Sequence, residues 1–268
     1  MPGGAGERIF GRNAVYEVLR GDRRRVSEID VAEGAEARGA LKRLLDLAAQ
    51  RRIPVRRVPR RDLDRQSDSH QGVGASVGAY PYVTVHEVLE HASQSGEPPF
   101  LLVLDLIQNP QNLGTLLRSA EAVGVHGVLL AEHRAVGITP AVVSSSAGAC
   151  EHLHVARGNL AQAMRALREA GVWLVGLEAG PESRLLDTVD LRGPLGLVIG
   201  NEGEGLRRLV RESCDVLAGL PMRGRVDSLN AAVAGSLALY AAWAARGYAG
   251  RRPSAPGVGY IDGGVESC

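Results

Sequence analysis

Three segments of the chain place polar side chains directly after short apolar stretches, where buried strands would end. In an open α/β sheet, ligands bind beyond the carboxyl ends of the strands, so polar residues there are candidates for chemistry. Their glycine, asparagine, serine, glutamate and arginine residues can admit a ligand to the main chain, cap a helix or hold a polar group. The three segments are 105–118, 200–205 and 220–230.

The first segment follows an apolar strand and opens a helix. Asn112 can cap that helix. Gly114 inside the first turns costs about 1 kcal/mol relative to alanine, which favours close approach of another group at this point. Arg118 lies four residues further on, on the same helical face. The same pattern also fits a capped helix that carries one surface arginine.

The second segment reads Gly-Asn-Glu-Gly-Glu-Gly, and its glycines let the main chain approach a ligand. Its spacing differs from the G-x-G-x-x-G of dinucleotide-binding loops, and Glu202 and Glu204 would repel a pyrophosphate. A nucleotide-dependent oxidoreductase is therefore disfavoured. In the third segment, Ser228 and Asn230 are typical capping residues, so helix capping is the alternative to a functional role.

The elements that must position these segments alternate along residues 99–248. Strands are predicted at 100–104, 127–131, 152–155, 172–177, 195–199 and 216–220. Helices are predicted at 113–123, 140–147, 160–170, 206–212 and 230–245. Buried apolar strands that alternate with helices predict an α/β fold, with a parallel sheet covered on both faces.

A smaller α/β unit of about 70 residues precedes this part, with predicted helices at 11–19 and 40–49 and strands at 27–31, 53–55 and 72–79. The composition divides the chain into five parts. These are a flexible leader (1–7), the small unit (8–78), a linker (79–98), the larger unit (99–248) and a flexible Gly/Pro-rich tail (249–268).

Charge is distributed unevenly between the two units. Residues 1–65 carry 16 basic and 10 acidic side chains, whereas residues 98–268 carry 15 and 16. Arginine forks bind phosphate oxygens well, so the basic N-terminal third suits a polyanion such as nucleic acid. A solvated surface neutralised by interleaved Asp and Glu explains the charge equally well.

Several other classes of protein are disfavoured. The three cysteines form no C-x-x-C pair, so neither a disulfide framework nor a zinc site is supported, and no metal is expected. No window reaches the roughly 18 consecutive apolar residues of a membrane span. The N-terminus lacks the apolar region of a signal peptide, so we expect a cytoplasmic protein.

Together, the polar segments resemble a known family. Asn109–Arg118, Ile199–Gly205 and Leu220–Asn230 resemble the three ordered motifs of the SpoU (TrmH-type) branch of the SPOUT RNA 2′-O-ribose methyltransferases, a match that spans about 99–248. Phe10–Val15 and His70–Ala75 resemble the L30e-like RNA-binding domain of the subgroup that methylates a guanosine in the P-loop of 23S rRNA. The tail is not part of this pattern.

The resemblance implies a C-terminal α/β-knot, in which the chain is threaded into a deep trefoil knot that binds S-adenosylmethionine. It also implies a homodimer with sites at the subunit interface, and an RNA substrate, 23S rRNA, rather than DNA. By position, the cofactor-binding residues would be Gly176, Ile199, Gly200, Leu220, Met222, Ser228 and Leu229. The family's polar catalytic residues would be Asn112, Arg118, Glu202, Ser228 and Asn230.

The implied reaction requires a poor nucleophile, a ribose 2′-hydroxyl, to be oriented and to lose its proton. Arg118 matches the residue assigned this role in the family, with Glu202 and Asn230 aligning it or the ribose. Whether Arg118 acts as a general base or stabilises the developing oxyanion stays open.

Three alternatives remain beside methylation of the P-loop guanosine of 23S rRNA. They are a tRNA guanosine 2′-O-methyltransferase, an antibiotic-resistance 23S rRNA methyltransferase and a non-enzymatic RNA-binding protein. The basic residues expected to contact RNA are Arg12, Arg56, Arg57 and Arg60.

Overall fold

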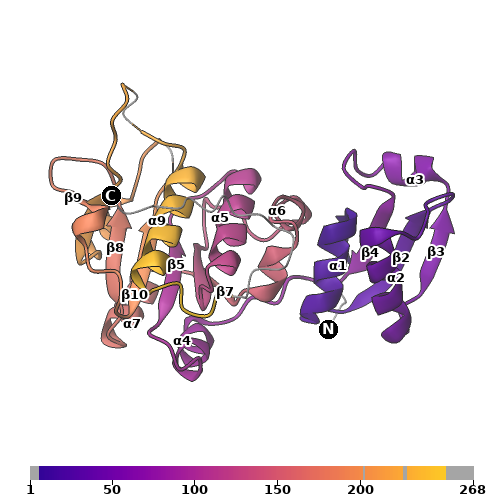
Figure 1. Cartoon of the computed structure of the whole chain (residues 1–268), viewed down its shortest axis with the longest axis horizontal. Helices are drawn as coiled ribbons and strands as arrows, with labels where there is room; N and C mark the ends of the chain where they lie inside the picture. The colour runs from indigo at the N-terminus through magenta and orange to yellow at the C-terminus, as the bar shows by residue number, and fades with distance from the viewer. Residues whose placement is uncertain (1–5, 202, 226–227, 252–268) are drawn as a thin grey trace, which may run out of the picture.

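The computed structural model describes residues 6–201, 203–225 and 228–251. Figure 1 shows two units side by side, the smaller N-terminal one coloured indigo and purple. The larger unit carries the later strands and the long helix α9. The expected tail lies mostly outside the described residues, as do Glu202 and Asp227.

The smaller unit is a four-stranded sheet of order β1-β4-β2-β3, in which β4 runs antiparallel to β1 and β2, and β3 runs parallel to β2. Its strands are β1 (Glu7–Phe10), β2 (Val26–Ala32), β3 (Val55–Val58) and β4 (Val73–Val77). Its helices are α1 (Arg12–Gly21), α2 (Gly39–Gln50) and α3 (Arg60–Asp64). Apolar side chains of α1 and α2, among them Leu19 and Leu44, are fully buried in its core.

The larger unit is a seven-stranded parallel sheet of order β7-β6-β5-β10-β8-β11-β9. Its strands are β5 (Phe100–Leu104), β6 (Gly127–Ala131), β7 (Val155–Gly158), β8 (Trp173–Leu177), β9 (Arg184–Leu185), β10 (Leu195–Ile199) and β11 (Val216–Gly219). Its helices are α4 (Val85–Gln94), α5 (Pro110–Ala122), α6 (Pro140–Ser145), α7 (Leu160–Glu169), α8 (Arg208–Glu212) and α9 (Ala231–Ala245), with short 3₁₀ helices η1 (Ala149–His152) and η2 (Leu186–Thr188).

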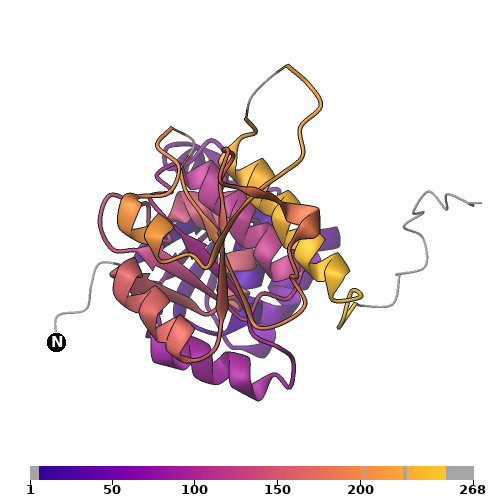
Figure 2. The ribbon, with the colours of Figure 1, turned by 90° about the vertical axis from the view of Figure 1, so that its left-hand side faces the viewer.

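Helices cover both faces of this sheet, as the alternating pattern predicts. Residues of α5 and α9 share one apolar cluster with side chains from one face of β5 and β10, whereas α4, α7 and α8 pack on the other face. Figure 2 shows the two layers, with α9 on one side and α4 and α7 on the other. The central strands β5, β6 and β10 are buried along their whole length.

Some sequence predictions are wrong in detail. The predicted strand 152–155 overlaps η1, and β7 begins only at Val155. Likewise β3 begins where the predicted strand 53–55 ends. Strand β1 begins at Glu7, inside the expected leader. The strand β9 and the helix α3 were not predicted at all, because both are too short to show periodicity.

The segment 79–98, expected to be a linker with a short helical piece, contains a helix that packs on the larger unit. Thr84 and Glu87 form a capping box at the start of α4, and Val88 and Ala92 are fully buried in the apolar cluster on one face of the larger sheet. In addition, Val83 pairs with Ala156 beside β7. This segment therefore packs as part of the larger unit from Val83 onward.

Candidate active site

A cavity of about 520 Å³ opens at the carboxyl ends of β8, β10 and β11. The three loops that follow these strands form most of its wall, and the first residues of α9 close it. The lining includes residues 177–179, 199–201, 203–206, 219, 220, 222, 228 and 229. Its position agrees with the general location of ligand sites in parallel sheets.

The loop after β10 is a tight turn that only glycine permits at two positions. A Cβ atom on Gly200 would lie 2.2 Å from the carbonyl oxygen of Gly205, which itself has a φ of +66°. The side chain of Asn201 closes the turn, because its Oδ1 accepts hydrogen bonds from the amides of Gly203 and Glu204 at 2.9 and 2.7 Å. The glycines thus bring main-chain groups to the cavity wall.

An ion pair with a buried carboxylate ties the far end of this loop to the end of the neighbouring strand. Asp105 follows β5 and is 0% exposed. Its carboxylate accepts hydrogen bonds from the Arg207 amide at 2.9 Å, from Nε at 2.7 Å and from Nη2 at 2.6 Å. This pair was not predicted from the sequence, although an acidic residue directly after a wholly apolar strand is a visible signal.

The electrostatics of the wall suit a cation. Arg211 is the only Lys or Arg among the described lining residues, and its guanidinium is bound to Glu178 at 2.9 Å and to Glu182 at 2.5 Å. These hydrogen bonds raise the pKa of Arg211 and lower that of Glu182. Because Glu178 and Glu204 also line the cavity, a phosphate would meet carboxylates without an unpaired cation, whereas a sulfonium would be favoured.

A polar junction joins the N-termini of α5 and α9. Asn230 caps α9, because its Oδ1 accepts hydrogen bonds from the amides of Ala232 and Val233 at 2.9 and 3.2 Å. Its Nδ2 donates to Oδ1 of Asn112 at 3.3 Å. The residue that caps α5 is Asn109 rather than Asn112. Asn112 and Asn230 are therefore brought together beside Ser228, which lines the cavity.

Two glycines of the larger unit are required by packing. Gly114 admits the neighbouring helix α6, the close approach of another group that its position predicts, because a Cβ there would lie 2.0 Å from Oγ of Ser145. Gly176 is buried inside β8, and a Cβ there would approach Cys214, Leu206 and Leu217 to 2.9 Å. Close packing therefore accounts for glycine at both positions, and contact of the Gly176 main chain with the cofactor stays a prediction.

The other expected cofactor residues lie in the cavity wall. Ile199, Gly200, Leu220, Met222, Ser228 and Leu229 all line it. Arg118 is exposed on α5 and is not among the residues that line the cavity. Glu202 lies outside the described residues. Among the nucleophilic side chains, Cys214 is not a candidate, because burial raises its pKa to about 12.

The four arginines expected to contact RNA are bound in different ways. Arg56 forms ion pairs with Asp30 and Glu28, both at 2.9 Å, and the hydrogen bond to Asp30 raises its pKa. Arg12 and Arg57 donate to main-chain carbonyls of Gln71 and of Ala32 and Ala35. Arg60 is only loosely paired, with Asp64 at 3.9 Å. Arg56 is therefore the least available to a phosphate.

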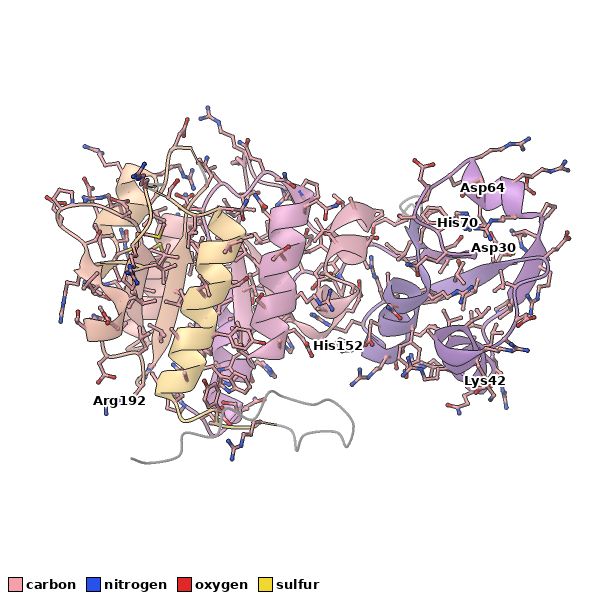
Figure 3. All side chains as sticks on the ribbon, turned by 45° about the horizontal axis from the view of Figure 1, so that its top comes forward. Asp30, Lys42, Asp64, His70, His152 and Arg192 are labelled. Atoms are coloured by element: carbon pink, nitrogen blue, oxygen red, sulfur yellow. The ribbon has the colours of Figure 1, made fainter. Side chains whose placement is uncertain are left out.

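Near Arg60, a buried histidine fixes the loop before β4. His70 is 2% exposed; its Nε2 lies 2.7 Å from Oδ1 of Asp64, and its Nδ1 accepts a hydrogen bond from the Gly72 amide at 2.8 Å. Figure 3 shows Asp64 and His70 close together on the smaller unit. His70, the first residue of the segment that resembles the L30e-like domain, thus orders the loop that precedes β4.

One face of α9 presents an apolar stripe to solvent. Val233, Leu237 and Tyr240 are 46%, 49% and 46% exposed, at helical spacing. No helix in the described ranges is long and apolar enough to cross a membrane. Within the same ranges, no three His, Cys, Asp or Glu side chains are grouped as metal ligands.

Comparison with known proteins matches the two units of the chain to two different family models. The model of the SpoU rRNA Methylase family matches residues 99–240, and the model for RNA 2′-O ribose methyltransferase substrate binding matches residues 8–83. The chain is 42% identical to the putative TrmH family tRNA/rRNA methyltransferase YacO of Bacillus subtilis, over 87% of this chain and 93% of that protein. It is also 42% identical to the 23S rRNA (guanosine-2′-O-)-methyltransferase RlmB of Xylella fastidiosa, over 87% and 94%.

Solved structures agree with the fold. The SpoU methyltransferase AviRb from Streptomyces viridochromogenes, in complex with the cofactor AdoMet, superposes with a TM-score of 0.74 at 25% identity, over 90% of each chain. An AdoMet-bound rRNA methyltransferase from Sinorhizobium meliloti also gives 0.74, at 24% identity, over 90% of this chain and 87% of that one. The expected fold class, a knotted α/β methyltransferase unit preceded by a small α/β unit, is confirmed.

Proposed function

The chain belongs to the SpoU rRNA methylase family, and from this premise we propose that it methylates the ribose 2′-hydroxyl of a guanosine in the P-loop of 23S rRNA. It is an S-adenosylmethionine-dependent RNA methyltransferase. The choice of rRNA rests on the smaller unit, which matches the family model for RNA substrate binding. It is supported by the 42% identity to the RlmB protein, over 94% of that protein's length.

The cavity fits the methyl donor. S-adenosylmethionine carries a sulfonium cation, which supplies an activated methyl group. Glu178 and Glu204 in the wall favour that positive charge, and Arg211 is held in place by its two carboxylate partners. A cavity of about 520 Å³ lies within the ordinary range for small-molecule sites, and main-chain groups of the loop 200–206 are placed to bind the donor.

The polar residues beside the cavity would handle the ribose. Ser228 lines the cavity, and the hydrogen-bonded pair Asn112–Asn230 stands at the joined N-termini of α5 and α9. We assign these three residues to orientation of the 2′-hydroxyl, and Glu202 to alignment of Arg118 or of the ribose. Arg118 is assigned to the proton of the 2′-hydroxyl, by removing it or by stabilising the oxyanion as it forms.

Arg118 is exposed and is not among the residues that line the cavity, and a site shared between two subunits would account for this. We propose a homodimer in which the exposed stripe Val233, Leu237 and Tyr240 is covered by a second copy, and in which the site is completed at that interface. Apolar side chains exposed at this spacing are typical of protein–protein contacts. The working compartment we propose is the cytoplasm, where ribosomal RNA would be met.

The test is to map 2′-O-methyl groups by mass spectrometry in RNA from cells with and without the protein. The proposal predicts that one 2′-O-methylguanosine disappears from the P-loop of 23S rRNA. Loss of a methyl group from tRNA instead would replace rRNA by tRNA as substrate, and an unchanged pattern in both RNAs would contradict the proposal. A methyl group found elsewhere in 23S rRNA would favour the antibiotic-resistance type of enzyme.

A further inference from the structure

The two units meet at a buried ion pair rather than at an apolar surface alone. Arg24, in the turn between α1 and β2, donates from Nε to Oε2 of Glu151 at 3.1 Å and from Nη2 to Oε1 of the same carboxylate. Glu151 belongs to η1 of the larger unit. The side chains are 2% and 1% exposed, so the pair is removed from solvent.

Further polar contacts satisfy the groups around this pair. Nη1 of Arg24 also donates to Glu7 at 3.0 Å and to the carbonyl of Gly78 at 3.3 Å, so the guanidinium is held from both units. The hydroxyl of Tyr80 donates to the carbonyl of Cys150 at 2.7 Å. Burial raises the pKa of Glu151, and the charge of Arg24 opposes that shift.

A second contact lies across the same boundary. Nε2 of His152 is 2.6 Å from Oε2 of Glu17 on α1, and Figure 3 shows His152 at the junction of the two units. Two glycines let the main chains approach closely there. A Cβ on Gly21 would lie 2.7 Å from the carbonyl oxygen of Glu151, and a Cβ on Gly148 would lie 2.5 Å from Cβ of Glu17. The two units thus approach closely at both of these glycines.

The segment that carries Glu151 connects the smaller unit to the helix of the candidate site. The helix η1 packs against α1 on one side and against α5 on the other. Helix α5 carries Asn112 and Arg118 and contacts α9 along its length, including the hydrogen bond between Ser119 and Ser236 at 2.8 Å. A rotation of the smaller unit would therefore have to break contacts that lead directly to the site.

We propose that Arg24 and Glu151 are positioning residues for the methyl transfer: their buried pair fixes the orientation of the smaller unit, so that RNA bound there presents one ribose to the cavity. This inference rests on the proposed function. An ion pair is directional, and a buried one is satisfied in only one arrangement, whereas an apolar contact tolerates sliding. Neither residue touches the substrate's reacting atoms; both act through the orientation of the unit that holds the RNA.

The test uses the full chain, the Glu151→Ala variant and two RNAs. One RNA is a 23S rRNA fragment long enough to contact both units, and the other is a short oligonucleotide containing only the target loop. We expect kcat/KM for the long fragment to fall roughly 10- to 100-fold, as misplacement of a substrate does. Turnover of the short RNA and S-adenosylmethionine affinity should be unchanged. An equal fall for both RNAs would indicate damage to the fold and would overturn the proposal.

Two further variants separate positioning from general stability. Glu151→Gln keeps an oxygen that can accept from Arg24, and it should give a loss for the long RNA smaller than that of Glu151→Ala. Arg8→Gln is the matched control, because it breaks a half-buried ion pair with Asp30 inside the smaller unit and leaves the boundary intact. If Arg8→Gln reproduces the selective loss for the long RNA, the boundary pair has no special role.

Small-angle X-ray scattering gives a readout that does not depend on activity. Glu151→Ala should enlarge the maximum dimension relative to the wild type at the same concentration, and Arg8→Gln should not. Unchanged scattering for Glu151→Ala would overturn the inference even if activity fell. If the wild type methylates neither RNA, the proposed function fails, and the scattering comparison still decides whether the pair fixes the smaller unit.

Discussion

The two units are built to bind their ligands by different means. The larger unit forms its cavity from loops in which glycine and main-chain groups dominate, and its one described lining arginine is neutralised by two carboxylates. The smaller unit instead exposes arginines, and the two of α3, Arg60 and Arg61, are paired only at 3.9 and 4.0 Å. Close fit therefore governs ligand binding in the larger unit, and charge governs it in the smaller unit. Substitutions that add volume should damage the larger unit, whereas salt and charge removal should act on the smaller one.

The largest effect is expected where the larger unit departs from this rule, at the exposed Arg118. Arg118→Ala should lower methyl transfer by about 10²- to 10⁴-fold, the range that a positioned proton-transfer group supplies. S-adenosylmethionine should still bind, because Arg118 is not in the cavity wall. Single-turnover transfer and isothermal titration measure the two quantities. Arg165→Ala, at an exposed position of α7, is the control, and near-normal turnover of Arg118→Ala would remove the assignment.

The next effect tests whether close fit governs donor binding. Gly200→Ala places a Cβ 2.2 Å from the main-chain oxygen of Gly205, and neither atom can move away as a flexible side chain would. S-adenosylmethionine affinity should fall at least about tenfold, as an interaction change of about 1.4 kcal/mol does. Gly203→Ala, in the same loop, meets nothing closer than 3.9 Å and should bind normally. Equal affinities in the two variants would show that the turn is adaptable.

A smaller effect should separate two arginines of the smaller unit. Arg60→Gln should weaken RNA binding and reduce the slope of log K against log salt by about 0.7 to 0.9, the amount lost with one phosphate contact. Arg56→Gln should change the slope less, because Arg56 is already bound to Asp30 and Glu28. Filter binding at several salt concentrations measures the slopes. A larger change in Arg56→Gln would reverse our ranking of the two residues.

The smallest effect concerns stability in acid. Burial lowers the pKa of His154, directly before β7, to about 4, with a further contribution from His91. Below the ordinary histidine pKa of about 6.5, the unfolded chain takes up a proton that the folded chain refuses, so stability falls as pH drops from 6.5 towards 4. His154→Gln should lessen this fall, measured as the urea midpoint at pH 7 and pH 5. An identical pH dependence in both proteins would contradict the assignment.

Parts of the account that depend on local sequence could be predicted, and parts that depend on distant pairs could not. The loop 200–205 and the polar residues Ser228 and Asn230 are recognisable because their types and spacing are local. The strands β5, β6 and β10 are continuous apolar runs, so their ends could be placed within a residue. The capping box of Thr84 and Glu87 is local and was also visible in the sequence, but the packing of its helix on the larger unit was not.

The features that could not be predicted are contacts between residues far apart in the sequence, ion pairs above all. Asp105 and Arg207 are 102 positions apart, and Arg24 and Glu151 are 127 apart, so no local pattern connects them. The same holds for Gly114, whose need for glycine comes from Ser145 on another helix. Such contacts depend on how the elements pack, which periodicity does not specify. The arginine clusters could be seen, but not which of their guanidinium groups are already paired.

The central claim is that the larger unit performs the chemistry and the smaller unit selects the RNA. The most direct test compares the full chain with a fragment of residues 83–251, which keeps α4 and its buried contacts. Both should bind S-adenosylmethionine equally. The fragment should methylate a 23S rRNA fragment at least about tenfold less efficiently than the full chain, because the phosphate contacts of the smaller unit are lost. If the fragment methylates that RNA with unchanged efficiency and selectivity, the smaller unit does not choose the substrate, and the division of labour proposed for the two units is wrong.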